Sequence, residues 1–250
     1  MAWHSYLLLV GAGLAAGFIN MLAGSGSAVT LPVLILLGLP ANVANGTNRV
    51  AIVLQNVAGV SAFRHQGVLD VRGAAMLSVP AVLGSVLGAQ VAVNLDEELM
   101  RRAIGALMLV MLVVIVVRPK RWLQGEMEEM TGRPNWRQLL LFFAIGVYGG
   151  FIQAGVGIFL LSGLVLGLGY DLVRANAVKV AIVLCLTFAA LWVFVRNGQV
   201  RWDVGLVLAI GNVIGAWLGA RVAVERGAVW VRRLLIVIVV FSAIRFLGVV

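Results

Sequence analysis

The sequence predicts an all-α polytopic membrane protein made of two inverted five-segment repeats, each with a short, broken second helix. Hydrophobic residues make up 62% of the 250 residues, charged residues only 12%, and the mean hydropathy is +1.06. A soluble domain carries about 25% charged residues, and several apolar runs here reach the roughly 20 residues that span a bilayer. We therefore expect a lipid bilayer, and no nucleic acid, around the chain despite its net charge of +9.

The two halves of the chain repeat each other. RVAIVL at 49–54 returns as KVAIVL at 179–184, and GSVLGAQVA at 84–92 returns as GAWLGARVA at 215–223. The offsets are 130 and 131 positions, so the register slips once. A repeat of this length is too long for a solenoid unit, and in a membrane chain it is typical of a transporter with two related halves.

Ten apolar segments divide the chain into a first transmembrane repeat at 1–117, a cytoplasmic linker at 118–137 and a second repeat at 138–250. The expected segments are 6–22, 28–38, 48–63, 73–93 and 99–117, then 138–153, 158–168, 176–195, 204–222 and 231–249. The stretch between the repeats is polar and contains two prolines and two glycines, which indicates a surface linker.

The second segment of each repeat is too short to cross a membrane. Eleven residues at 1.5 Å each reach about 16 Å, roughly half of the hydrocarbon core. Gly24-Ser25-Gly26 precedes one of them and Gly155-Val156-Gly157 the other. Glycine-interrupted short segments at matching places point to a transporter binding site. The alternative is that these glycines only let helices pack closely.

An odd number of crossings per repeat predicts that the repeats have opposite orientations. With inversion, eleven basic residues collect on the side of the linker and five on the other side. The positive-inside rule then places the linker in the cytoplasm and both termini outside a multi-pass protein of the cytoplasmic membrane.

The charged residues favour an anionic substrate. All ten acidic residues lie in or beside expected loops, which argues against a cation substrate and against a carboxylate proton relay. The sequence shows no metal-ligand cluster, nucleophile–base pair or phosphate loop, so we expect neither an enzyme nor a bound cofactor. Gly84, Gly88, Gly211, Gly215 and Gly219 lie at a spacing of four that is typical of close helix packing.

Two cations stand at equivalent repeat positions, Arg49 and Lys179, each at the start of a third segment. They either form an anion site near a pseudo-two-fold axis or lie at helix ends and reach the lipid headgroups. Helix starts after the glycine breaks would add unpaired N–H groups for an anion. The predicted substrate-binding residues are Asn20, Gly24, Ser25, Gly26, Ser27, Asn45, Thr47, Asn48, Arg49, Gln153, Gly155, Gly157, Asn176 and Lys179.

Several motifs in order resemble the sulfite exporter TauE/SafE family of membrane proteins. They are GFINMLAGSGSAVTLPVLILLGLPANVANGTNRV at 17–50, the turn RHQG at 64–67, and the echoes GGFIQAGVGIF, ANAVKV and GNVIGAWLGARVA in the second half. The resemblance covers nearly the whole chain. It implies movement of small anions, particularly sulfite, sulfoacetate and related organosulfonates, across the cytoplasmic membrane. Ser25 and Ser27 interrupt the family's usual glycine-rich turn, a departure that bears on anion selectivity.

The leading hypothesis is a secondary carrier whose partners are a small anion and the lipid bilayer. The alternatives are a passive anion channel of the same architecture and a membrane scaffold that transports nothing. The identity of the anion, the coupling ion and the presence of a homo-oligomer stay open at this point.

Overall fold

The computed structural model describes residues 3–106 and 134–225, and all regular structure in these residues is helical. The helices are α1 (Trp3–Ala23), α2 (Ser27–Leu36), α3 (Ala41–His65), α4 (Val71–Val93), α6 (Trp136–Phe151), α7 (Val156–Leu168), α8 (Leu172–Arg196) and α9 (Trp202–Glu225). A further helical stretch occupies 97–106. The expected segment at 231–249, most of the expected linker and residues 107–117 of the expected segment at 99–117 lie outside the described residues.

The helices confirm the prediction of an all-helical polytopic membrane protein. Four of those described are long and apolar enough to cross a membrane: Trp3–Leu22, Val71–Val93, Leu172–Arg196 and Trp202–Val222. Apolar side chains also face outward in stripes. On α4, Val79, Leu83, Leu87 and Val91 are each more than half exposed at a helical spacing of four, as on a surface that meets lipid.

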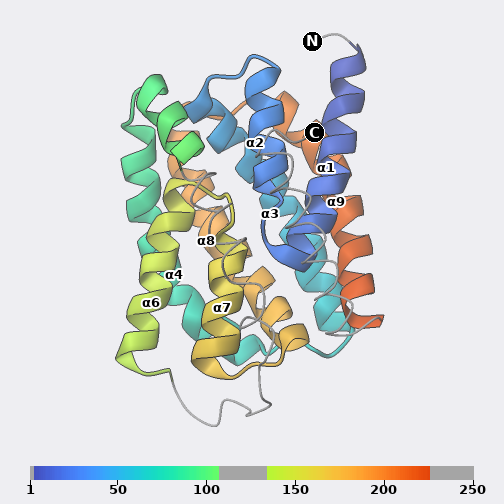
Figure 1. Cartoon of the computed structure of the whole chain (residues 1–250), viewed down its shortest axis with the longest axis vertical. Coiled ribbons are helices and arrows are strands. Elements are labelled where there is room, and N and C mark those ends of the chain that lie inside the picture. Colours follow the sequence, from blue (N-terminus) through green and yellow to red (C-terminus); the bar gives the residue numbers. More distant parts are fainter. Residues whose placement is uncertain (1–2, 107–133, 226–250) are drawn as a thin grey trace.

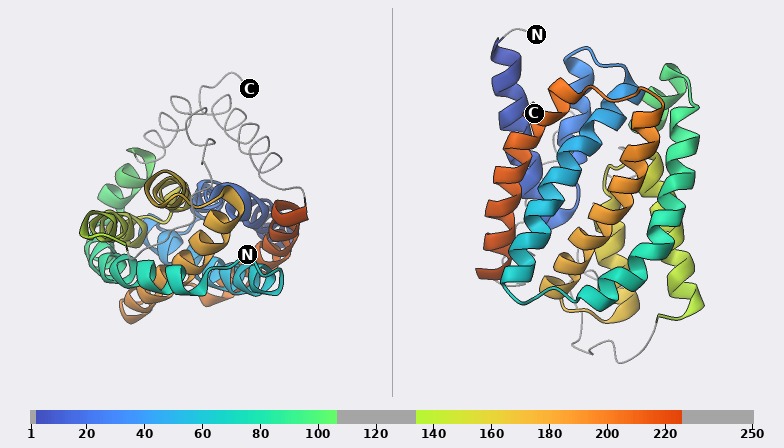
Figure 2. Two further views of the ribbon diagram at one scale, coloured as in Figure 1. Left: turned by 90° about the horizontal axis from the view of Figure 1, so that it is seen from below. Right: turned by 180° about the vertical axis from the view of Figure 1, so that it is seen from behind.

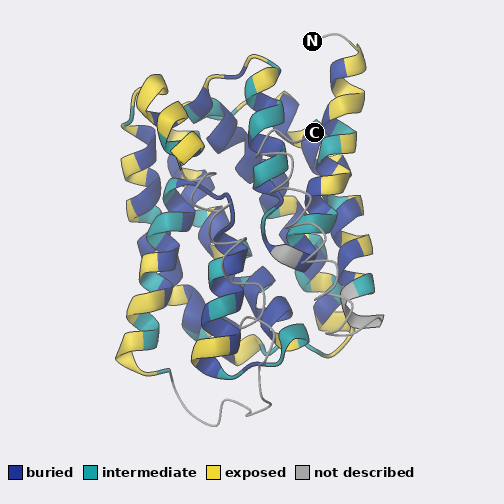
Figure 3. Cartoon of the chain, in the orientation of Figure 1, coloured by how far each residue is buried: buried dark blue, intermediate teal, exposed yellow. Residues whose placement is uncertain are grey.

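Two broken helix pairs lie in front of the long helices (Figures 1 and 2). Helix α1 runs from one end of the molecule to its middle, where the chain turns back and returns as α2. Helix α6 starts from the opposite end, stops in the middle, and the chain returns as α7. Helices α3 and α8 also run in opposite directions (Figure 1). Buried residues gather between these layers (Figure 3).

The turn between α1 and α2 and the turn between α6 and α7 are the two breaks, and they contact each other through their backbones. Gly24, with φ of +71°, accepts a hydrogen bond of 3.2 Å on its carbonyl oxygen from the Gly157 N–H. A Cβ on Gly24 would lie 2.4 Å from the Cα of Gly157, so no other residue fits without movement. Both the positive φ and the close approach therefore require glycine at position 24.

Glycines also join the first helix of each half to the fourth helix of the other half. On α9, a Cβ on Gly211 or Gly215 would lie 2.0 or 2.1 Å from a backbone oxygen of α1. On α4, a Cβ on Gly84 or Gly88 would lie 2.2 or 1.9 Å from a backbone oxygen of α6. The packing role predicted from the spacing of these glycines is confirmed.

A hydrogen bond joins the turn before α4 to the turn before α8. Asp70 caps α4 by accepting from the Gly73 N–H at 2.9 Å, and its second carboxylate oxygen accepts from the Tyr170 hydroxyl at 2.6 Å. Partial burial acts to raise the pKa of Asp70, but the hydrogen bonds from Tyr170, Gly73 and Arg72 outweigh it and hold that pKa below its usual value. Burial and the neighbouring carboxylate raise the pKa of Tyr170.

Two third-segment helices begin earlier than expected. Helix α3 begins at Ala41 rather than at 48, and α8 begins at Leu172, capped by Asp171, rather than at 176. In α3, Asn45 and Asn48 form hydrogen bonds with residues of other helices, so these polar side chains are buried inside the helix. Helix α6 begins at Trp136, two residues before the expected start, with a capping box between Asn135 and Gln138.

Candidate functional site

Arg49 lies inside α3 with its side chain completely buried. One terminal guanidinium nitrogen donates to the Gly149 carbonyl at 3.1 Å and to Gln153 Oε1 at 3.0 Å. The other donates to the Gly150 carbonyl at 2.6 Å and to Asn45 Oδ1 at 3.4 Å. Gly149 and Gly150 belong to the last turn of α6, where carbonyls lack partners within their own helix. The arginine thus caps the end of a helix in the other half of the chain.

Lys179 takes the matching place in α8, with 1% of its surface exposed. Its Nζ donates to the carbonyls of Asn20 at 3.0 Å and Met21 at 3.2 Å, both in the last turn of α1. Its third bond, of 2.6 Å, goes to Asn176 Oδ1 one turn earlier in α8. All three donors of this ammonium are therefore occupied.

The two cations cap the broken helices crosswise. Arg49 of the first half holds the end of α6, and Lys179 of the second half holds the end of α1. A helix C-terminus carries partial negative charge, so each cation meets a favourable dipole end at depth. The two residues lie eight and seven positions beyond the first residues of their helices, or roughly 12 and 10 Å along the axis. The alternative that they reach the lipid headgroups from helix ends is therefore wrong.

Further predicted residues of α3 bond to both breaks. Asn45 Nδ2 donates to the Phe151 carbonyl at 2.8 Å, next to the carbonyls held by the arginine. Asn48 donates to Ser27 Oγ at 3.1 Å and accepts from the Thr30 hydroxyl at 2.7 Å, which ties α3 to the first turns of α2. Sequence reasoning missed Thr30; its signal was a lone hydroxyl three residues after Ser27 in an apolar run.

The amides that end the first helices occupy the two break regions. Asn20 Oδ1 accepts from the Gly26 N–H at 3.4 Å. Gln153 lies beyond the end of α6, accepts from the buried arginine, and donates to Thr187 Oγ1 at 2.9 Å. Gly155, with φ of +74°, forms the N-cap of α7. Ser25 lies in the turn before α2, where its carbonyl accepts from the Ala28 N–H.

One predicted residue is not part of this arrangement. The Thr47 hydroxyl accepts from the Arg201 N–H at 2.9 Å, at the turn between α8 and α9. Phe194 was not predicted, although its ring centroid lies 4.6 Å from the guanidinium carbon of Arg49. A phenylalanine in an apolar helix gives no sequence signal for such a contact, because the same residue serves in any core.

Two buried donors beside the cations have no acceptor among the described residues. They are Nε of Arg49 and Nδ2 of Asn176. The orientation of the Asn176 amide is assigned from its contact with Lys179: the ammonium can only donate, so the amide oxygen faces it and the amide nitrogen points away. No described carboxylate forms a salt bridge with Arg49 or Lys179, since the ion pairs of the described residues lie at helix ends. Such an arrangement suits an anion with several oxygens, because buried donors without acceptors are costly.

Comparison with known proteins bears on the role of the two breaks and their buried cations. The model of the sulfite exporter TauE/SafE family matches residues 9–246. The chain belongs to this family. The TauE/SafE resemblance of the sequence motifs is thereby confirmed over nearly the whole chain.

Relatives of this TauE/SafE protein carry transporter names. It is 27% identical over 249 residues to the probable membrane transporter protein ORF9 of Sinorhizobium sp, covering 99% of this chain and 94% of the relative. It is 27% identical over 227 residues to a probable membrane transporter protein of Haemophilus influenzae, covering 90% and 88%. It is 25% identical over 224 residues to YfcA of Escherichia coli, also named a probable membrane transporter protein, covering 89% and 82%. No solved structure matches the chain significantly.

Proposed function

We propose that this TauE/SafE protein is a secondary transporter that moves a small anion across the cytoplasmic membrane. Sulfite, sulfoacetate or a related organosulfonate is the proposed substrate, bound where the two breaks meet. The observation that carries the proposal is the pair of buried cations at the two breaks. Nε of Arg49 and Nδ2 of Asn176, next to Lys179, are buried donors without an acceptor, and no carboxylate of the described residues pairs with either cation. Helix-end carbonyls offset only part of two full positive charges, so an anion is favoured there.

We also propose that the two halves are inverted repeats, with the linker cytoplasmic and both termini outside. The opposite directions of α3 and α8, and the return of α2 and α7 toward opposite ends, support this arrangement (Figure 1). The crosswise capping by Arg49 and Lys179 supports it too, because equivalent residues then make equivalent contacts. Inversion would allow the site to open to either side by similar movements.

The tight crossing favours a carrier over a channel. The breaks meet through glycine backbones, and the cations are buried with most of their donors occupied. A carrier passes through a closed state of this kind, whereas a channel needs a continuous path. A scaffold has no need for two buried cations, which cost stability through the loss of their hydration.

The test begins with a thermal-shift screen of the purified protein against sulfite, sulfate, thiosulfate, taurine and sulfoacetate. The best ligand is then titrated against Arg49→Met and against Arg49→Lys, which keeps the charge. Loss of a charge-assisted hydrogen bond should weaken binding roughly tenfold to a hundredfold in Arg49→Met and less in Arg49→Lys. Wild-type affinity in Arg49→Met would refute the site. Uptake into proteoliposomes with and without an imposed pH gradient separates a coupled carrier from a channel.

A further inference from the structure

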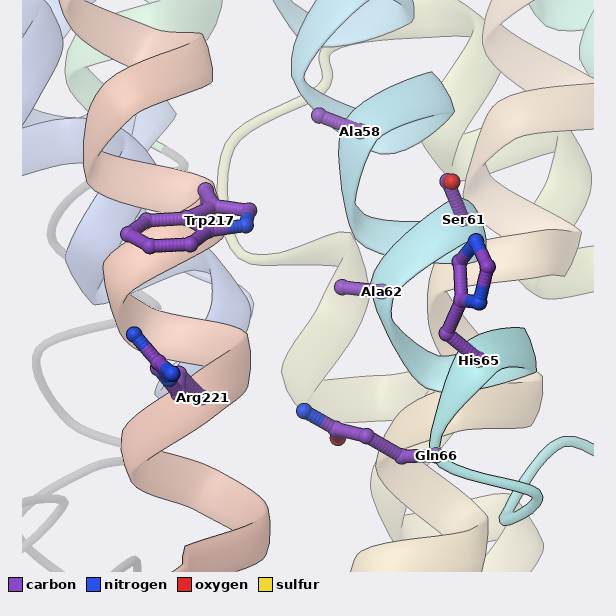
Figure 4. Close-up of a pocket in the computed structure, with 7 residues that line it drawn as sticks. All are labelled: Ala58, Ser61, Ala62, His65, Gln66, Trp217 and Arg221. Carbon is purple, nitrogen blue, oxygen red and sulfur yellow. The ribbon is translucent and has the colours of Figure 1, made fainter.

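A groove lies on the outside of the bundle, away from the crossing, between the ends of α3 and α9 (Figure 4). Its volume is about 440 Å³, and its lining consists of Ala58, Ser61, Ala62, His65, Gln66, Trp217 and Arg221. The small side chains of α3 leave the space, and Ala58 and Ala62 point from α3 toward α9 (Figure 4). The indole of Trp217, 49% exposed, bounds the opposite wall.

The lining of the groove changes from polar and cationic at one end to apolar at the other. His65 is the last residue of α3, and Arg221 lies at the end of the membrane-spanning part of α9, which reaches Val222. Ala58 lies seven residues before the end of α3, about 10 Å deeper in the membrane, and Trp217 about 6 Å deeper than Arg221. The polar and cationic end therefore lies at headgroup level, and the apolar end lies at the level of acyl chains.

We propose that this groove binds one anionic phospholipid. Arg221, His65 and Gln66 would donate to the phosphate, while an acyl chain would lie along the alanines and the indole of Trp217. The lining offers the guanidinium of Arg221, the imidazole of His65 and the amide of Gln66 as donors, so this end of the groove can donate hydrogen bonds to a phosphate. Basic grooves between helices at the membrane surface suit acidic lipid headgroups. The guanidinium carbon of Arg221 lies 5.1 Å from the Trp217 ring centroid, which fixes the charge beside the apolar wall.

The chain supplies its own matched control at the end of α8. There, the guanidinium carbon of Arg196 lies 5.7 Å from the ring centroid of Trp192, the same pairing at the same spacing of four residues. The described groove has no lining residue from that pair. Arg196→Gln thus removes an equivalent charge without touching the groove.

The experiment measures lipid selectivity by native mass spectrometry. The full chain is reconstituted in nanodiscs with equal amounts of phosphatidylglycerol and phosphatidylcholine. The protein is then released from the nanodisc in the mass spectrometer, and the lipid molecules that stay bound to it are counted. The wild type should retain phosphatidylglycerol preferentially. Arg221→Gln should reduce that preference about fivefold, the effect of roughly one juxtamembrane charge. Ala58→Leu, which fills the apolar end and keeps every charge, should reduce retention of the lipid as well.

Three outcomes would overturn the proposal. The first is an unchanged preference in Arg221→Gln, and the second is an equal loss in the Arg196→Gln control, which would indicate a general effect of charge. The third is displacement of the bound lipid by excess inorganic phosphate, which would indicate a site for a free anion. Because the readout is bound lipid, these outcomes do not depend on transport of the proposed substrate.

Discussion

Replacing Arg49 by methionine tests whether this side chain caps the end of α6. Methionine is unbranched and apolar, so it fills much of the same volume and donates no hydrogen bond. The substitution leaves four buried acceptors without this donor: the carbonyls of Gly149 and Gly150, Oε1 of Gln153, and Oδ1 of Asn45. The expected result is a marked loss of stability, because these groups cannot reach water.

The magnitude follows from the number of orphaned groups. Each buried acceptor left without a partner costs about 1–3 kcal/mol. Gln153 can turn toward other partners, and removal of the buried charge recovers part of its desolvation cost. We therefore expect a net loss of about 3–5 kcal/mol, similar to the breaking of a buried ion pair. For a chain of this size the melting temperature should fall by on the order of 10 °C.

The assay is thermal unfolding in a mild detergent, monitored through tryptophan fluorescence. The matched control is Arg101→Met, since Arg101 is exposed and forms a surface ion pair with Glu97 at 2.9 Å. Such a surface pair contributes about 0.5 kcal/mol or less, so the control should melt within a few degrees of the wild type. Equal melting temperatures for the two variants would refute the capping role.

Three further predictions concern the turns. Tyr170→Phe should lower the melting temperature near neutral pH, and the difference should shrink below about pH 4, because a depressed pKa of Asp70 stabilises the fold only while its carboxylate is ionised; a constant difference would contradict this. Gly24→Ala should destabilise more than Gly67→Ala in parallel melts, since both glycines have φ near +70° but only the former meets a facing backbone at 2.4 Å. With the native cysteine removed, Gly67→Cys and Gly198→Cys should label from opposite sides of the membrane; labelling from one side would contradict the inversion.

Much of the helical framework was predictable from length and composition. The short segments were too short to span a bilayer, and the glycines before them marked the breaks correctly. The early start of α3 was missed for a physical reason. Asn45, Asn48 and Arg49 lower the hydropathy of a stretch that is nevertheless buried, because their partners lie on other helices. Hydropathy measures a residue alone and does not register a partner a hundred positions away.

The site was predictable as a set of residues but not as a set of contacts. Arg49 and Lys179 stood out because they occupy one repeat position, and both prove to be buried. Their partners are mainly backbone carbonyls, which every residue possesses, so no side-chain pattern indicated which helix end each would hold. Phe194 gave no signal for the same reason, since any apolar helix contains such residues.

The crosswise contacts mean that neither half of the chain satisfies its own broken helices. The end of α1 needs Lys179 of the second half, and the end of α6 needs Arg49 of the first. Under the proposed function, an anion would compete for these donors with the helix-end carbonyls. Each anion oxygen that took an N–H from Arg49 would weaken its hold on Gly149 and Gly150. Substrate binding would then loosen α6 from α3, which links occupancy of the site to movement between the two halves.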